Sequence, residues 1–334
     1  MQAPKLVNMA LPPPPGIIGS LRAGFDVIAA HVTVVLMPLG LDLLLWLGPR
    51  LSLNQIAQPL LAQASSLAPS SGLQPADVTA ALDVYSQFFK SFNLLVALRT
   101  FPVGVSSLMS GRMPAQSPLG TPLTLQLDSP LHVLGIIFAL TLVGWMFGAL
   151  YFHWVASLVG AQALSESPAA AAHALFQTLL YSVICAALAW TLGLPLLLVL
   201  YMLFAINTLL GEGVLLFLGF ISLWLIVPLF FSPHGIFIRK QNALASFLGS
   251  FQLTRFTLPT SSLFVLTVCL LGVGLNFLWS VPADDSWLAL VGILGHAFVS
   301  TALLASSFVY YQDMSSWLQT VLARLRASMP AHQA

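Results

Sequence analysis

The chain has 334 residues, of which 58% are hydrophobic and 6% are charged, and its formal net charge is +1. Soluble domains carry about 25% charged residues, and nucleic-acid-binding domains carry a strongly basic patch, so this composition excludes both classes. The 2 cysteines lie inside apolar runs, which leaves neither a disulfide framework nor a paired-cysteine metal or redox site.

Charged residues are confined to the gaps between long apolar stretches. From Leu131 to Val309 they lie at or beside the ends of apolar runs, and they are Glu166, Glu212, Arg239, Lys240, Arg255, Asp284 and Asp285. A bilayer core about 30 Å thick is crossed by a helix of roughly 20 apolar residues, and a charge inside it is expensive. The pattern predicts an all-α, multi-pass transmembrane bundle of about six spans, with amphipathic helices at the interfaces.

The N-terminal part is predicted to contain an uncleaved membrane anchor. Residues 1–23 carry basic side chains, but Pro12 to Pro15 interrupt the apolar core that a cleavable signal requires. We therefore expect a cytoplasmic segment at 1–23 and the first transmembrane helix at 24–48, which is long enough to cross a bilayer.

The segment 49–130 is predicted to lie on the extracytoplasmic side. Apolar residues recur at helical spacing between 76 and 101, which indicates an amphipathic helix that lies in the interface or caps the bundle. Asp77 suits its start and Pro102 its end. The apolar stretch from Phe101 to Met113 is too short to span, so it is expected to dip into the membrane and return, as a packed cover or as a surface for a partner or lipid.

Residues 131–311 are predicted to form a five-span bundle. The spans are Leu131–Val159, Ala174–Phe204, Val214–Phe231, Thr260–Trp279 and Trp287–Tyr310. Gly193 and Pro195 are expected to kink the span that contains them; a rival interpretation breaks the chain there and adds a seventh span. Glu212 is expected in the turn that follows, and the acidic pair after Pro282 in a short outer turn before the last span.

A second amphipathic helix, at 238–257, is predicted on the cytoplasmic face. Its apolar stripe and its separate basic residues suit an anionic lipid surface, which attracts each basic residue by roughly 1 kcal/mol. The same shape suits a coupling helix that docks into an ATPase subunit, but the coupling motif of ABC importer permeases is not matched here.

This region also carries a family resemblance. The order Asn242-Ala243-Leu244-Ala245-Ser246, then Gln252 to Arg255, then an apolar span resembles several bacterial membrane families. They include the membrane domain attached to some glycerophosphodiester phosphodiesterases. The resemblance covers the C-terminal half of the chain and implies a six-helix membrane module. No catalytic phosphodiesterase domain is present, so that activity is not implied.

The distribution of basic residues favours a cytoplasmic N-terminus. With six spans, seven of the 11 lysines and arginines share the side of the two termini, and four face the other side. Those four are Arg50, Lys90, Arg99 and Arg112. The sequence therefore predicts an integral protein of a bacterial cytoplasmic membrane, with a cytoplasmic C-terminal tail at 312–334.

Ionisable and polar residues inside the predicted spans are the candidate functional residues. Asp42 lies near the outer end of the first span, where it either caps a neighbouring helix or handles a proton or ion. His296 is expected to hydrogen-bond to Asn276, as a packing contact or within a proton relay. His31 and His153 occupy the inner thirds of their spans, where they can approach each other. No metal-ligand spacing occurs, so no metal and no cofactor is predicted, and haem ligation by a histidine is the alternative.

The sequence predicts a non-enzymatic accessory or scaffold component of the membrane. It contains no phosphate-binding loop, no nucleophile elbow and no acidic metal–phosphate motif, so no enzymatic activity is predicted. The expected partners are the lipid bilayer and other membrane-protein subunits, and not nucleic acid. The alternatives are a transporter or permease for a small or amphiphilic substrate, and a membrane-embedded lipid enzyme that uses Asp42 and a histidine.

Overall fold

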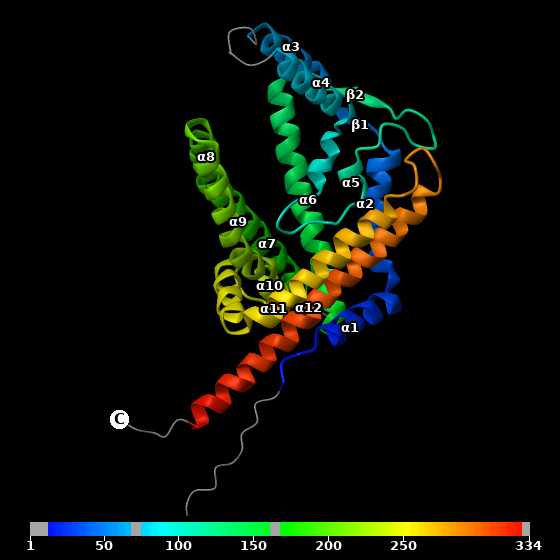
Figure 1. Cartoon of the computed structure of the whole chain (residues 1–334). Helices are drawn as coiled ribbons and strands as arrows, with labels where there is room; N and C mark the ends of the chain where they lie inside the picture. Colours follow the sequence, from blue (N-terminus) through cyan, green and yellow to red (C-terminus); the bar gives the residue numbers. More distant parts are fainter. Residues whose placement is uncertain (1–12, 68–74, 161–167, 329–334) are drawn as a thin grey trace, which may run out of the picture.

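The computed structural model describes residues 13–67, 75–160 and 168–328. The structure is 81% helical, which confirms the all-α prediction. Two short strands of the described chain, β1 (Arg50–Ser52) and β2 (Thr124–Gln126), pair in parallel at one end of the molecule (Figure 1). Lys5, Pro12 and Glu166, on which parts of the topology prediction rest, lie outside the described residues.

Five helical segments of the described chain are long and apolar enough to cross a membrane, or six if a bent N-terminal pair forms one span. Because helices satisfy their backbone hydrogen bonds internally, they can cross the hydrocarbon core. The protein is therefore a multi-pass helical membrane protein. The five segments are α6 (Pro130–Val159), the continuous α7–η4–α8 (Pro168–Leu188, Ala189–Gly193, Leu194–Ile206), α9 (Thr208–Phe231) with α10 (His234–Ile238), α11 (Ala243–Trp279) and α12 (Ala289–Ser328).

Helix α12 forms the centre of the molecule, with α11 alongside it (Figure 1). Its most apolar stretch is 56% buried, whereas the corresponding stretch of each other candidate span is at most 18% buried. Helix α1 (Ile17–Ala30) packs against the same helix, and its Gly24 contacts Ser306. Ser306 Oγ also donates to the carbonyl of Leu21 at 3.2 Å. The outer helices consequently leave large apolar faces for lipid.

The first span predicted at 24–48 is wrong as a single helix. Helix α1 ends at Ala30, and after the 3₁₀ turn η1 (Val32–Val35) helix α2 (Leu36–Leu47) continues at 91° to it. The break lies at His31, whose φ of −132° and ψ of 54° are non-helical. Helix α1 also begins inside the segment predicted as a cytoplasmic tail. The bend is set by the packing of α1 on α12, which the local sequence does not show.

The chain does not reverse at Gly193 and Pro195, so the seven-span alternative is not observed. A π-helical stretch, η4, joins α7 and α8 in one continuous helix. Proline lacks a backbone donor and clashes with the carbonyl four residues before it, and a π-helical turn is one of the recognised ways in which a helix absorbs such a break.

Glu212 lies within α9 and not in the preceding turn. The chain reverses at Asn207, whose side chain accepts hydrogen bonds from the N–H groups of Leu209 at 2.9 Å and Leu210 at 3.3 Å. This N-cap starts the helix before the glycines that flank Glu212. Gly211 instead leaves room for Phe204, since a Cβ added there would lie 2.5 Å from the ring.

The amphipathic helix predicted at 76–101 ends earlier than expected. It is α4 (Pro75–Ser91), which packs with α3 (Asn54–Leu67) at the end of the bundle (Figure 1). Asn93 starts a new 3₁₀ helix, η3 (Leu94–Leu98), by accepting a hydrogen bond from the N–H of Leu95 at 3.1 Å. The residues after Asn93 therefore leave the α4 direction.

The helix predicted at 238–257 is the first part of α11, and it starts later than predicted, after Asn242, which caps it by accepting from Ala245 N at 2.8 Å. A kink at Thr257, whose φ of −123° and ψ of 15° are non-helical, separates it from the part of α11 that holds the fifth predicted span. Its position on the cytoplasmic face stays a prediction. Leu244 is 61% exposed and Leu248 is 55% exposed, while the hydroxyl-bearing side is buried. An apolar face turned outward suits lipid.

The C-terminal tail predicted at 312–334 begins within a helix, because α12 continues to Ser328.

Candidate functional site

A largely non-helical segment enters the bundle and returns. It runs from Leu94 to Met113 and is called the re-entrant segment below. Val103 is fully buried and Val105 is 4% exposed. Ser106 Oγ, farther along, donates to Ser300 Oγ of α12 at 2.7 Å. The buried residues of the part from Phe101 to Met113 are those of a packed element, as in the packed-cover expectation, and its dip into the membrane stays a prediction.

Glycines allow the re-entrant segment to contact α6 directly. A Cβ added at Gly148 of α6 would lie 2.7 Å from the Cα of Gly104, a distance that real Cβ atoms essentially never show. Trp145 Nε1, one turn away on the same helix, donates to the carbonyl of Phe101 at 3.2 Å. Non-helical backbone at membrane depth must be shielded in this way.

Asp42 holds the far end of the re-entrant segment. Its carboxylate accepts from Ser107 Oγ at 2.5 Å, from the N–H of Leu108 at 3.1 Å and from the N–H of Met109 at 2.9 Å. These groups stand at the start of the four-residue helix α5 (Met109–Arg112). Asp42 is fully buried. Of the two expectations for this residue, the capping of a neighbouring helix is confirmed, and proton or ion handling stays a prediction.

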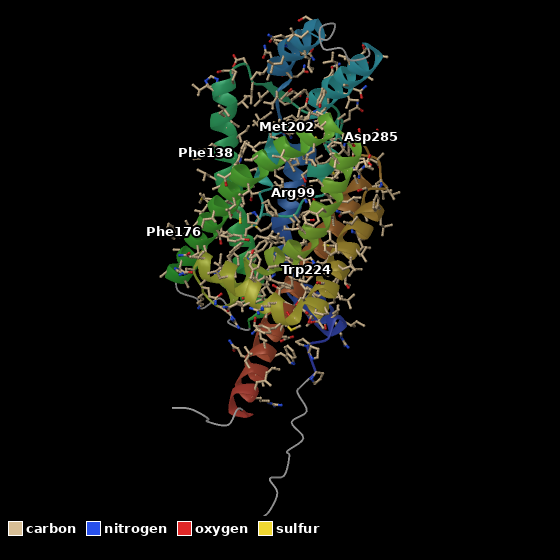
Figure 2. All side chains as sticks on the ribbon, turned by 60° about the vertical axis from the view of Figure 1, so that its left-hand side comes forward. Arg99, Phe138, Phe176, Met202, Trp224 and Asp285 are labelled. Carbon is tan, nitrogen blue, oxygen red and sulfur yellow. The ribbon has the colours of Figure 1, made fainter. Side chains whose placement is uncertain are left out.

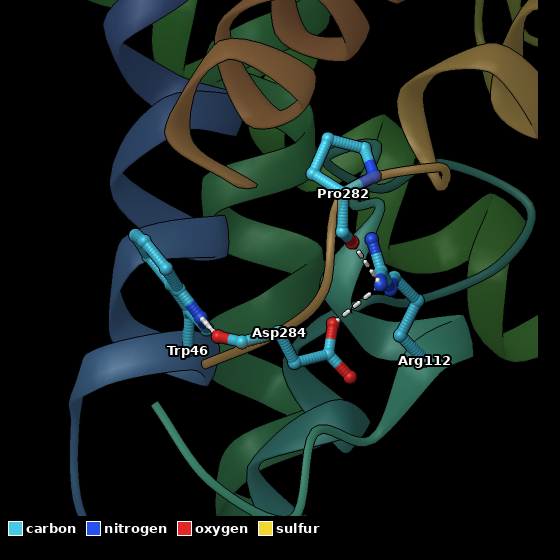
Figure 3. A network of polar contacts seen from close by, with 4 residues as sticks. All are labelled: Trp46, Arg112, Pro282 and Asp284. Carbon is cyan, nitrogen blue, oxygen red and sulfur yellow. Dashed lines mark hydrogen bonds and ion pairs between the residues drawn. The ribbon is translucent and has the colours of Figure 1, made fainter. Parts of the chain in front are cut away.

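An ion pair ties the end of the segment to the turn between α11 and α12 (Figure 3). Arg112 lies 2.7 Å from the carboxylate of Asp284 and donates to the carbonyl of Pro282 at 2.7 Å. Trp46 Nε1 of α2 donates to the Asp284 carbonyl, also at 2.7 Å. Burial raises the pKa of Asp284 above its ordinary value, and the charge of Arg112 opposes that rise. The sequence predicts the acidic turn but neither of its partners.

A cavity of about 570 Å³ lies between the re-entrant segment and helices α6, α7, α9, α10, α11 and α12. Pockets of this size hold small ligands. Most of its wall is apolar, and several wall residues lie on the outer surface, including Phe101 at 79% exposed and Val273 at 58%. The cavity therefore reaches the face of the molecule that meets lipid. Its polar wall residues include Tyr181, His234, Asn276, His296, Ser300 and Ser307.

His296 and Asn276 form a hydrogen-bonded pair in this wall. His296 Nδ1 lies 2.7 Å from Asn276 Oδ1, which confirms the predicted contact between the last two spans. Asn276 Oδ1 is an acceptor, so Nδ1 carries the proton and Nε2 is left as an acceptor. His296 is 7% exposed, and its Nε2 has no hydrogen-bond partner within the described chain. A ligand hydroxyl in the cavity would satisfy this atom.

A second buried histidine, His234, also borders the cavity. Its Nε2 lies 2.8 Å from Ser307 Oγ of α12, and the residue is 2% exposed. His234 is not among the residues that the sequence predicts for the site, because it stands between two apolar spans, in a predicted cytoplasmic connection. Its position directly after Pro233, which breaks the helix, was the available signal.

The other two candidate histidines are not brought into this cavity. His31 is exposed, and its Nδ1 lies 3.0 Å from the carbonyl of Val27. His153 lines a separate, small cavity beside Gln312. An approach of His31 to His153 stays a prediction. Within the described residues no group of three or more histidine, cysteine, aspartate or glutamate side chains could hold a metal ion.

Arg99, like Glu212, lies elsewhere than the sequence predicts. It was assigned to the outer amphipathic helix, but it belongs to the re-entrant segment, where its Nη1 donates to Ser110 Oγ at 2.9 Å. Its side chain is exposed. The sequence signal for this position is the pair Gly144 and Gly148 of α6, four residues apart, where the re-entrant segment contacts the helix.

Comparisons with protein-family models, with curated proteins and with solved structures found no significant match to this chain. The resemblance to the membrane domain of glycerophosphodiester phosphodiesterases therefore stays a prediction.

Proposed function

We propose that the protein is a transporter or permease that admits an amphiphilic molecule from the bilayer into its cavity. The observation that carries the proposal is an apolar cavity that reaches the outer surface and has the His296–Asn276 pair in its wall. Apolar walls with a few placed polar groups are typical of sites for small amphiphiles. Ionisable groups within a membrane domain are functional candidates by default.

The interrupted elements around the cavity support this proposal. Secondary transporters commonly build their substrate sites from discontinuous helices near the bilayer midplane. Here the re-entrant segment contributes Phe101 and Pro102 to the cavity wall. A bacterial cytoplasmic membrane with the N-terminus in the cytoplasm is part of the proposal, and it rests on the distribution of basic residues.

A matched pair of glycine substitutions on α11 tests the proposal. Gly272 lines the cavity, and a Cβ added there would meet its nearest atom, Leu303 Cδ1, at 3.9 Å. Gly274 has nothing within 4 Å of an added Cβ and does not line the cavity. Gly272→Phe therefore fills the cavity, and Gly274→Phe places the same ring elsewhere.

The assay measures how a fluorescent single-chain phospholipid crosses the bilayer of liposomes that contain the purified protein. A membrane-impermeant quencher is added outside, and transfer is the increase in the fraction of probe that it quenches. The wild type and Gly274→Phe are expected to transfer the probe, and Gly272→Phe to reduce transfer at least about tenfold. Equal transfer by both variants, or none by the wild type, would refute the proposal.

A role as an accessory or scaffold subunit is the second candidate, and the α8–α9 hairpin favours it. Within the described chain α8 has no buried residue and packs mainly on η4 and α9. Its large side chains are exposed, for example Leu197 at 62% and Tyr201 at 74%. Mass spectrometry after gentle extraction from native membranes tests this role: another polypeptide at fixed stoichiometry supports it, and a chain that emerges alone contradicts it.

A further inference from the structure

Arg99 lies level with the middle of a membrane-spanning helix. Its two neighbours contact Gly144, the central part of α6: a Cβ added there would lie 2.5 Å from Leu98 O and 2.6 Å from Thr100 Cγ2. Helix α6 has 30 residues and is roughly 45 Å long. Its centre therefore lies inside a hydrocarbon core about 30 Å thick, whichever end projects.

Figure 2 shows the same position from the side. Arg99 lies at mid-height of the helical part of the molecule, at a level between Met202 of α8 and Trp224 of α9. Asp285, in the turn between α11 and α12, lies well above it. Arg99, predicted in an outer segment, thus lies at the height of the spans.

The charge of Arg99 has no carboxylate partner in the described part of the chain. The carboxylate of Asp42 accepts hydrogen bonds from Ser107 and two backbone N–H groups. Arginine keeps its charge in proteins, and a charge at membrane depth is costly unless water or an anion compensates it. Ser110 accepts a hydrogen bond from one guanidinium nitrogen of Arg99, and the residue as a whole is exposed.

The cavity begins two residues after Arg99. Phe101 and Pro102 form part of its wall, and so does His296. A cation therefore lies two residues from the wall of an apolar space, and one wall atom of that space, His296 Nε2, has no partner within the described chain. An amphiphile has complementary parts: an anionic group for the guanidinium, a hydroxyl for the imidazole and a chain for the cavity.

We propose that Arg99 binds the phosphate or carboxylate headgroup of a lipid-like amphiphile whose acyl chain occupies the cavity. Guanidinium groups bind both anions through paired, charge-assisted hydrogen bonds. The inference rests on the proposed function, because it assigns the headgroup chemistry of the molecule that enters the same cavity. It makes Arg99 the residue that selects anionic over neutral amphiphiles.

The test compares two probes that differ in the phosphate alone: oleoyl lysophosphatidate and monoolein, which share the acyl chain and the glycerol. Binding to the full-length protein in neutral detergent is measured by native mass spectrometry. The wild type is expected to bind lysophosphatidate at least about tenfold more tightly than monoolein, the gain typical of a hydrogen bond to a charged group. Inorganic phosphate at the same ionic strength is expected not to displace lysophosphatidate.

Three variants separate the headgroup contact from folding. Arg99→Gln should reduce the preference for lysophosphatidate to within about twofold while monoolein binding is retained, which also shows that the cavity is intact. Arg99→Lys keeps the positive charge but lacks the paired N–H donors of the guanidinium, so it should retain part of the preference for lysophosphatidate. Lys90→Gln removes an exposed cation from α4 and should change neither affinity.

The outcomes distinguish the two proposals. If the wild type binds neither probe, the proposed function fails. If it binds both equally, or if Arg99→Gln keeps the full preference, the assignment of Arg99 is overturned while the cavity proposal stands. Displacement of lysophosphatidate by inorganic phosphate, together with no binding of monoolein, would identify a site for free anions and overturn the amphiphile.

Discussion

The carboxylate of Asp42 accepts a hydrogen bond from the backbone N–H of Met109, 67 residues further along the chain. With the bonds from Ser107 and Leu108, this contact fixes a non-helical segment against the membrane-spanning helices. A buried carboxylate is retained here because three donors satisfy it. The position of Arg99, and with it the chemistry assigned to the cavity, follows from that attachment and from the glycine contacts on α6.

Removal of the Asp42 carboxylate should destabilise the protein. Asp42→Ala leaves the buried donors of Ser107, Leu108 and Met109 without an acceptor, which costs about 1–3 kcal/mol for each unsatisfied group. Thermal unfolding in detergent should show a clear decrease in midpoint. Asp26→Ala is the control, because its ion pair with Arg22 has side chains 73% and 83% exposed, and exposed pairs contribute little. Equal midpoints for Asp42→Ala and the wild type would contradict the capping role.

Enlarging Gly148 should displace the re-entrant segment. An alanine there places its Cβ 2.7 Å from the Cα of Gly104, so backbone must shift, at a cost of about 1–3 kcal/mol. Gly135→Ala on the same helix is the matched control, since nothing lies within 4 Å of a Cβ there. The unfolding midpoint should decrease for Gly148→Ala and stay unchanged or increase for Gly135→Ala. A midpoint unchanged in both variants would show that the segment does not depend on this contact.

The His296–Asn276 hydrogen bond should give a measurable coupling energy. A double-mutant cycle of His296→Ala and Asn276→Ala isolates it, and such bonds in membrane proteins average about 0.6 kcal/mol. The free energy of unfolding of the wild type, both single variants and the double variant supplies the four values. A coupling of zero would mean that the pair does not form in the folded protein.

Asp284 should make stability depend on pH in a stated direction. Burial raises its pKa in the folded protein above the ordinary value, so the folded state holds this proton more tightly than the unfolded chain. The contribution of Asp284 to the free energy of unfolding is therefore complete at pH below the ordinary pKa, and it is lost as the pH rises through the raised pKa. Asp284→Asn, which cannot titrate, should remove that part of the decrease in unfolding midpoint. If the unfolding midpoint of the wild type instead rises relative to that of the variant between the ordinary pKa and the raised pKa, the pKa of Asp284 is not raised in the folded protein.

Arg112→Gln should enlarge the same effect. The charge of Arg112 opposes the rise in the pKa of Asp284, and its guanidinium also holds the Pro282 carbonyl. Without it, the loss of stability should extend to higher pH, and the unfolding midpoint should be lower at neutral pH. Arg255→Gln on α11 is the control for the loss of one exposed cation. An unchanged pH profile in Arg112→Gln would indicate that this ion pair does not govern the turn.

The sequence alone predicts the class of the protein, the contact between His296 and Asn276, and a capping role for Asp42 without its partner. The placement of charges beside the ends of apolar runs indicates spanning helices, because the cost of a charge in hydrocarbon is a property of each residue by itself. The His296–Asn276 contact is predictable because the two residues lie 20 apart across one short turn. Antiparallel helices joined by such a turn bring residues at similar distances from it to the same depth.

Only the tertiary structure shows the position of Arg99 beside α6 and the bend in the first predicted span. The helical pattern around Arg99 is the same for a helix on the membrane surface and for a segment inside the bundle, since both have one apolar side. The difference is made by Gly104, Gly144 and Gly148, where backbone meets backbone, and by Asp42, which caps α5 from another helix. Such contacts join residues far apart in the chain, so no local pattern records them.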